Sequence, residues 1–181
     1  MKITKLLSFF AFALLGLSSC GPNLSYLTED LYADNRWSDD ELKKIQFYVS
    51  QDIVLRREAS SGVSKIESGR IKVVDGKKVE EIVIRKGTPG VFLFRPQENR
   101  FAVSFESGGR DRYLMFGPNP QARGRYVLLA SDWKRTQGLV SYDNAKYYTP
   151  TSSAYAALMV DMKKVRRIAL RSRTAKGRSV D

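Results

Sequence analysis

Hydrophobic and polar side chains alternate along much of the chain after residue 44, and a period of two is typical of β-strands with one buried face. Alternating or short apolar segments occupy residues 45–56, 71–74, 79–85, 91–94, 101–105, 113–116, 126–130, 138–142 and 145–148. The turn-forming pairs Asp75-Gly76 and Asp143-Asn144 each predict a hairpin. The pattern therefore predicts a mainly β fold, either a small antiparallel β-barrel or a sandwich.

Local signals refine where these elements begin and end. Pro96 is expected to stop the strand that begins at Val91, and Gly117-Pro118-Asn119-Pro120 is expected to form a rigid loop. The segment 45–56 is long for one strand, so we expect it to be bent and to serve two parts of a sheet. Ser38-Asp39-Asp40-Glu41 fits a capping box, which predicts one short helix that ends near residue 44.

The segment 155–170 fits two different periods. A helix would place on one face Tyr155, Leu158, Met159, Met162 and Val165. A strand would place on one face Leu158, Val160 and Met162. We favour the strand because the preceding chain reads as a β-meander, and a second helix near residues 153–166 remains the alternative.

The N-terminus carries an export signal that ends in a cysteine. Lys2 and Lys5 precede an apolar run from Leu6 to Leu17, which is shorter than the roughly 20 residues needed to span a bilayer. Leu17-Ser18-Ser19-Cys20 resembles the lipobox of bacterial lipoproteins. The resemblance implies that residues 1–19 are a signal peptide and that Cys20 becomes an acylated first residue, carrying two or three fatty-acyl chains such as palmitate.

The same resemblance implies a location in the bacterial cell envelope. Gly21 is not the aspartate that favours retention in the inner membrane of enteric bacteria, so a cell with two membranes is expected to send the protein to the outer membrane. Residues 20–37 are expected to form the lipid-anchored tether, and 38–181 a single β-rich domain with a basic C-terminal tail. Because the tether is rich in leucine and aromatic residues, we expect it to lie against its own domain; docking onto a partner is the alternative. A short acylated tether before an aromatic-rich β domain is similar to small lipoproteins of Bacteroidota.

Composition removes most familiar catalytic chemistry. The chain has no histidine, and Cys20 is its only cysteine, which excludes histidine-based triads, cysteine nucleophiles, zinc sites and disulfides within the chain. Carboxylate chemistry, a Ser-Lys pair or a metal held by oxygen ligands remains. Glu80 and Glu81 are adjacent in a predicted strand and so point to opposite faces, and the S-x-x-K match from Ser131 to Lys134 falls in a turn.

Positive charge is concentrated near the C-terminus. The formal charge of +12 becomes +10 when the two lysines of residues 1–19 are removed. The candidate anion-binding residues are Lys163, Lys164, Arg166, Arg167, Arg171, Arg173, Lys176 and Arg178. The alternative is a solvated edge strand whose charges prevent edge pairing. A weaker signal comes from loop residues that would make one basic patch only if the loops share an end of the domain: Arg110, Arg112, Arg123, Arg125, Lys134 and Arg135.

Together these features predict a lipid-anchored envelope protein that acts by binding, as an accessory or scaffold subunit of an envelope or outer-membrane assembly. The expected partners are the membrane, through acylated Cys20, and a membrane-associated protein, but not nucleic acid, and no cofactor is expected. The alternatives are recognition of an anionic envelope glycan or lipid and, in a different class, a carboxylate-dependent glycan hydrolase.

Overall fold

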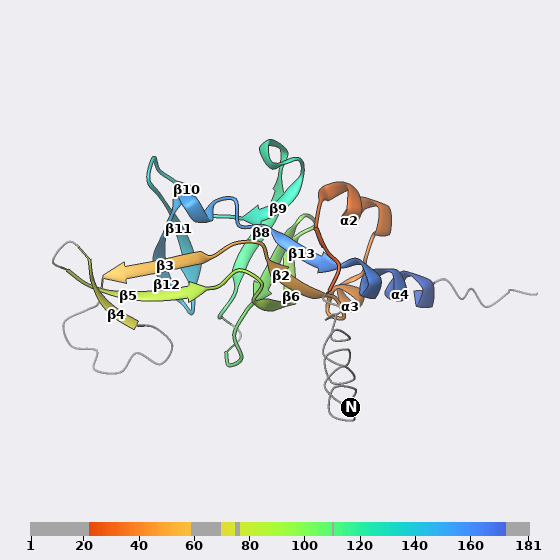
Figure 1. The fold of residues 1–181 in the computed structure, drawn as a ribbon, viewed down its shortest axis with the longest axis horizontal. Coiled ribbons are helices and arrows are strands. Elements are labelled where there is room, and N and C mark those ends of the chain that lie inside the picture. Colours follow the sequence, from red (N-terminus) through yellow and green to blue (C-terminus); the bar gives the residue numbers. More distant parts are fainter. Residues whose placement is uncertain (1–21, 59–69, 75–76, 110, 173–181) are drawn as a thin grey trace, which may run out of the picture.

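Two antiparallel sheets share one hydrophobic core in the computed structural model of the chain (Figure 1). The structure describes residues 22–58, 70–74, 77–109 and 111–172. In this part of the chain neither strand order closes on itself, and the sheets form a sandwich-like arrangement. The expected mainly β fold is thus confirmed in its sandwich form rather than as a barrel.

The larger sheet has the strand order β1-β13-β2-β6-β7-β8-β9. Its strands are β1 (Leu24–Tyr26), β13 (Leu158–Asp161), β2 (Gln46–Val49), β6 (Pro89–Gln97), β7 (Arg100–Ser104), β8 (Leu114–Asn119) and β9 (Arg125–Leu128). The sheet is curled, because the Tyr126 N–H donates to the Leu27 carbonyl at 3.0 Å and the Leu128 N–H donates to the Ala156 carbonyl at 2.9 Å. Through these isolated contacts β9, at one edge of the sheet, lies close to the residues that flank β1 and β13 at the other edge. The curled sheet encloses the aromatic core.

The smaller sheet has the strand order β10-β11-β12-β3-β5-β4. Its strands are β10 (Asp132–Trp133), β11 (Gln137–Tyr142), β12 (Ala145–Pro150), β3 (Ile53–Glu58), β5 (Lys77–Ile84) and β4 (Arg70–Val74). Both predicted hairpins are confirmed, since β4 pairs with β5 and β11 pairs with β12. Asp143 and Asn144 take φ values of 49° and 57°, the left-handed conformation that a two-residue hairpin turn requires.

The segment 45–56 does serve both sheets, as its length suggested. Its first half is β2 in the larger sheet and its second half is β3 in the smaller one. The chain crosses between Val49 and Ile53, both fully buried. Because both ends of this crossing are buried in the same hydrophobic cluster, the two sheets pack around one core.

Two predictions about proline were wrong. Pro96 lies within β6, and Gly117, Pro118 and Asn119 extend β8 instead of forming a loop. In both places the strand has lost one neighbour: β2 pairs with β6 only as far as Val91, and β7 pairs with β8 only as far as Phe116. A strand with a single partner tolerates proline because its missing N–H is not needed on the open side.

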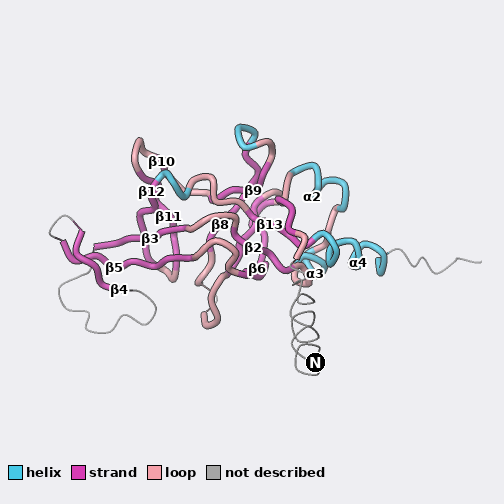
Figure 2. The backbone as a smooth tube through the Cα atoms, viewed as in Figure 1, coloured by secondary structure: helices cyan, strands magenta, loops and turns pink. Residues whose placement is uncertain are grey.

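The α-helices of the described residues gather at one end of the molecule (Figure 2). They are α2 (Glu29–Asn35), α3 (Asp39–Leu42) and α4 (Met162–Ser172), and the short 3-10 turns are η2 (Pro120–Ala122) and η3 (Thr151–Ser153). The capping box is confirmed, since Ser38 Oγ accepts from the Glu41 N–H and Glu41 Oε2 accepts from the Ser38 N–H. Helix α2, capped by Thr28, was not expected.

The ambiguous segment 155–170 contains both elements in succession. The favoured strand is confirmed only over Leu158–Asp161, and the helix starts at Met162, later than the alternative near 153–166 placed it. The apolar face of α4 therefore comes from Met162, Val165 and Ile168, which pack against the core. Asp161 ends the strand and caps the helix, because its Oδ1 accepts from the Lys163 N–H at 3.0 Å.

Residues 24–37 belong to the folded unit. Strand β1 pairs with β13, and Leu27, Tyr32 and Trp37 are 0%, 6% and 2% exposed. These contacts are those expected of a segment that lies against its own domain, and all three residues belong to the hydrophobic core. Among the described residues, no helix has the length and apolar character needed to cross a membrane.

We predict that Leu27→Ala destabilises the protein by about 2–5 kcal/mol, because Leu27 is fully buried and the change leaves a cavity. Urea unfolding followed by tryptophan fluorescence measures the effect. Leu24→Ala, at a half-buried position of the edge strand β1, is the matched control and should cost less. Equal stability of Leu27→Ala and the unaltered protein would show that residues 24–37 are a detachable tether.

Candidate functional site

The outer face of α4 is a row of cations. Lys163, Lys164, Arg166 and Arg167 are exposed, while Val165 between them is 2% exposed and points into the core. Within the part of the chain that the structure describes, none of these four side chains forms an ion pair. We call these four residues the basic face of α4. Their charge is not neutralised locally and is available to an external anion.

The start of α4 lies beside the start of the described chain. Leu24 is the register partner of Asp161, and the Met162 N–H donates to the Asn23 carbonyl at 3.2 Å. Cys20 precedes Asn23 by three residues, and three extended residues span at most about 11 Å. Chain length alone therefore limits how far Cys20, the predicted lipidation site, can lie from the first turn of α4.

The remaining predicted anion-binding residues follow the basic face in sequence. Arg171 falls within α4, although its side chain is not among those described. Arg173, Lys176 and Arg178 lie outside the described residues, as does Cys20. Four of the eight predicted anion-binding residues therefore lie together on one face of α4.

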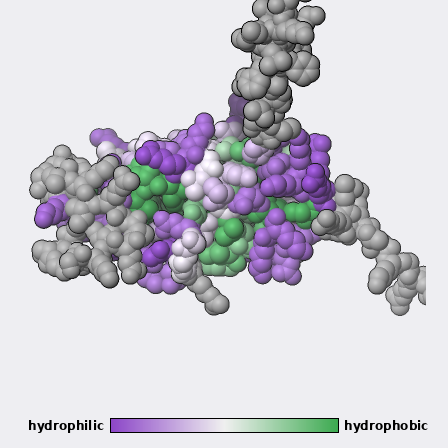
Figure 3. Space-filling view, turned by 60° about the horizontal axis from the view of Figure 1, so that its bottom comes forward, coloured by the Kyte–Doolittle hydropathy of each residue, from purple (hydrophilic) through white to green (hydrophobic). Residues whose placement is uncertain are grey.

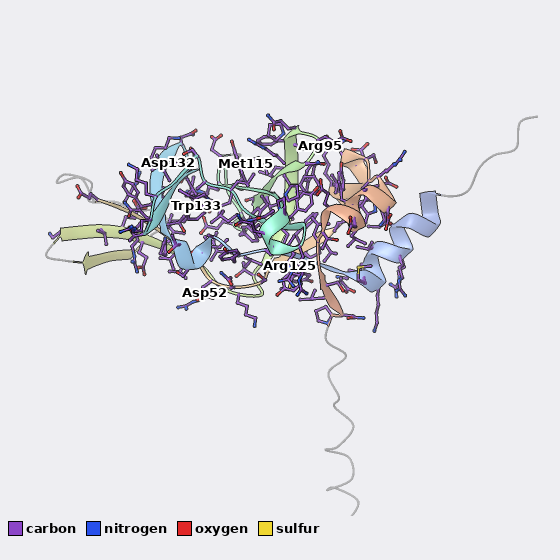
Figure 4. All side chains as sticks on the ribbon, turned by 90° about the horizontal axis from the view of Figure 1, so that it is seen from above. Asp52, Arg95, Met115, Arg125, Asp132 and Trp133 are labelled. Atoms are coloured by element: carbon purple, nitrogen blue, oxygen red, sulfur yellow. The ribbon has the colours of Figure 1, made fainter. Side chains whose placement is uncertain are left out.

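The loop cations do not form a single patch. Arg112 pairs with Asp143 at 3.1 Å, the Arg125 guanidinium lies 3.8 Å from the centre of the Tyr26 ring, and Lys134 lies 3.8 Å from Asp132. Figure 4 shows Arg125 well separated from Asp132 and Trp133. Arg110 lies outside the described residues. Arg112, Arg125 and Lys134 therefore each serve a local contact, whereas no side-chain contact to the described residues is seen for Arg123 or Arg135.

A second charged arrangement lies on the smaller sheet and was missed by sequence reasoning. Arg56 Nε donates to Glu81 Oε2 at 2.8 Å, and Arg57 Nε donates to Glu80 Oε2. Both pairs join register partners of β3 and β5. The glutamates are 5% and 4% exposed, so their charges are buried beneath half-exposed arginines. The signal in the sequence was an Arg-Arg pair and a Glu-Glu pair on two strands, but their register was not known.

Glu80 also accepts a hydrogen bond from Tyr147. The Tyr147 hydroxyl donates to Glu80 Oε1 at 3.2 Å, and the Arg57 guanidinium lies 5.0 Å from the centre of the Tyr147 ring. Burial, with the Glu80 charge as a second cause, raises the pKa of Tyr147 to about 12. Arg57, Glu80 and Tyr147 therefore form a buried polar network between strands β3, β5 and β12.

The two glutamates point to different partners, as their adjacency predicted. Glu80 pairs with Arg57 and Glu81 with Arg56. The S-x-x-K match spans β10, a strand, whereas lysine activation of serine in that motif depends on one helical turn. Among the described residues, no three acidic, histidine or cysteine side chains cluster closely enough to hold a metal ion.

Figure 3 shows hydrophilic residues over much of one face, with hydrophobic residues in separate patches. Comparison with protein-family models, with curated proteins and with solved structures finds no match. The functional argument therefore rests on the chemistry of these surfaces.

We predict that the Tyr147 network makes the protein less stable in alkali. An unfolded tyrosine loses its proton near pH 10, whereas folded Tyr147 keeps it to about pH 12, so stability falls as pH rises through that window. Tyr147→Phe removes this contribution, so its unfolding free energy should fall less between about pH 9 and about pH 11. Urea titrations measure this, with Tyr148→Phe, at the exposed neighbouring residue, as the control. The same pH dependence in both variants would contradict the raised pKa.

Proposed function

We propose that this protein is a lipid-anchored binding protein of the bacterial cell envelope, attached through acylated Cys20 and acting as an accessory or scaffold subunit. In a cell with two membranes, we place it in the outer membrane. We further propose that the basic face of α4 rests on the anionic surface of the membrane to which Cys20 is anchored. The mature protein is then held at its membrane both by the acyl chains on Cys20 and by the basic face of α4.

One observation carries the proposal: the pairing of β1 with β13 joins the residues after Cys20 to the first turn of α4. An anchored Cys20 would hold this turn close to the lipid headgroups. Each lysine or arginine near an anionic leaflet contributes about 1 kcal/mol, and the effect fades within a Debye length. With Cys20 anchored, the four exposed cations of α4 would lie within this distance of an anionic leaflet.

The acyl chains and the basic helix have different roles in this proposal. More than one acyl chain is enough for durable attachment, since each buried methylene contributes about 0.8 kcal/mol. The helix adds orientation, because charge on one face of a packed helix can meet the bilayer in only one way. The sheets then present a defined surface to a partner.

We predict that Cys20→Ser abolishes lipid attachment. Mass spectrometry of the N-terminal peptide should show an acylated Cys20 as the first residue of the unaltered protein. In the variant, residues 1–19 should remain and no acyl mass should appear, because serine supplies no thioether. A mature N-terminus at another position, or an unmodified Cys20, would contradict the proposed anchor.

We predict that residues 21–181, prepared without lipid, bind vesicles that contain phosphatidylglycerol and not vesicles of phosphatidylcholine alone. Replacing Lys163, Lys164, Arg166 and Arg167 by glutamine should weaken this binding at least about tenfold, as should added salt. Sedimentation with vesicles measures the bound fraction. The matched control removes the same charge from exposed positions elsewhere: Lys78, Lys86, Lys134 and Arg135. Equal weakening by both sets would mean that net charge alone attracts the protein, and that α4 is not the binding face.

A further inference from the structure

A groove lined by residues of the smaller sheet opens on its surface. This sheet lies at the end of the molecule opposite the described α-helices (Figure 1). The groove has a volume of about 830 Å³, within the range of ligand sites in proteins. Residues of β3 and β12 line it, among them Arg56, Arg57, Lys146, Tyr148 and Thr149. The groove is distinct from the basic face of α4, so a ligand here does not compete with a membrane for that helix.

The two groove arginines are held in place and keep donors to spare. Each uses Nε to bind a glutamate that is at most 5% exposed, while the arginine side chains are 44% and 40% exposed. The terminal Nη atoms of Arg56 and Arg57 make no hydrogen bond to other described residues. A buried carboxylate that holds a guanidinium from behind limits the rotamer entropy lost when the outer N–H groups bind an anion.

The exposed aromatic ring of Tyr148 lies beside Arg56. Tyr148 is 49% exposed and is the register partner of Arg56. Lys146, two residues earlier on β12, lies on the same face of the strand because side chains alternate. Arg56 therefore lies across from Tyr148 on the neighbouring strand, and Lys146 lies further along β12 on the same face, where its Nζ also donates to Ser141 Oγ at 2.6 Å.

The wall of the groove also contains a polar atom with no partner. Thr149 is 0% exposed, and its Oγ1 makes no hydrogen bond to the described residues. Buried hydroxyls are normally paired, and an unpaired one costs about 1–3 kcal/mol. Side chains alternate along β12, so the Thr149 hydroxyl lies on the buried face, opposite Lys146 and Tyr148, and is not counted among the groups that meet a ligand.

From these observations we infer that the groove binds an acidic polysaccharide. A sugar ring stacks on Tyr148, and its carboxylates are held by Arg56 and Lys146, which lie on the same face of the sheet. An acidic peptide fits less well, because peptides commonly add a strand to a free sheet edge, and β3 and β12 are both interior strands. A small inorganic anion would leave the aromatic ring and most of the groove volume unused.

The test uses the lipidated full-length protein in neutral detergent micelles, with oligogalacturonate as the probe and a malto-oligosaccharide of the same length as the neutral comparison. Calorimetry should show binding of the acidic oligomer only, weakened by salt. Tyr148→Ala should weaken it about tenfold, whereas Tyr155→Ala, at a 58% exposed tyrosine outside the groove, should not. Lys146→Gln should weaken it about fivefold, with Lys43→Gln, at the residue that follows α3, as the control.

Arg56 and Arg57 are left unaltered because removing either takes a cationic partner away from a buried glutamate and threatens folding. Thermal unfolding checks that each variant is folded. Failure of the folded protein to bind oligogalacturonate, or equal weakening by Tyr148→Ala and Tyr155→Ala, overturns the inference. Preference for a poly-glutamate peptide over the oligosaccharide also overturns it, in favour of a protein ligand. Because the micelles are neutral, none of these results depends on whether α4 binds anionic lipid.

Discussion

The antiparallel pairing of β1 with β13 is the constraint on which the arrangement of this protein depends. It joins the first described residues to a strand near the other end of the sequence, with Leu24 opposite Asp161. Asp161 is nearly buried and caps the next helix, so the same residue ends the strand and begins α4. Strand β1 and the first turn of α4 therefore lie side by side at one edge of the larger sheet.

The same constraint separates two kinds of surface. At the helical end, unpaired cations stand on a helix whose other face, from Met162 to Ile168, is packed into the core. At the other end, the arginines of β3 are held by buried glutamates of β5, and an exposed tyrosine of β12 lies beside them. Mobile surface cations suit a fluid layer of headgroups, whereas oriented cations beside a flat ring suit a ligand of defined shape. We therefore propose that the helical end of the domain faces the membrane and that the smaller sheet faces a ligand.

Much of the strand order along the chain was predictable, because the period of two and the turn pairs are local signals. The Asp143-Asn144 hairpin, the capping box at Ser38 and the bent segment 45–56 all followed from neighbouring residues. The errors arose where tertiary contacts decide. Pro96 and Pro118 remain in strands because a neighbouring strand has already ended, and the Arg56–Glu81 pair depends on a register that no local pattern reveals. The cations near the C-terminus were visible in the sequence, but their position beside the anchor required the β1–β13 pairing.

The most direct test of this account is a measurement of which residues meet the bilayer in the lipidated protein. Cys20 is the only native cysteine and is acylated in this account, so a single cysteine introduced at Lys163 on α4 or at Lys78 on β5 can carry a fluorophore. A quencher attached to lipid headgroups should quench the fluorophore at position 163 more strongly than at 78, and the difference should grow when anionic lipid is added. Equal quenching at both positions, unchanged by anionic lipid, would contradict the claim that α4 lies on the membrane.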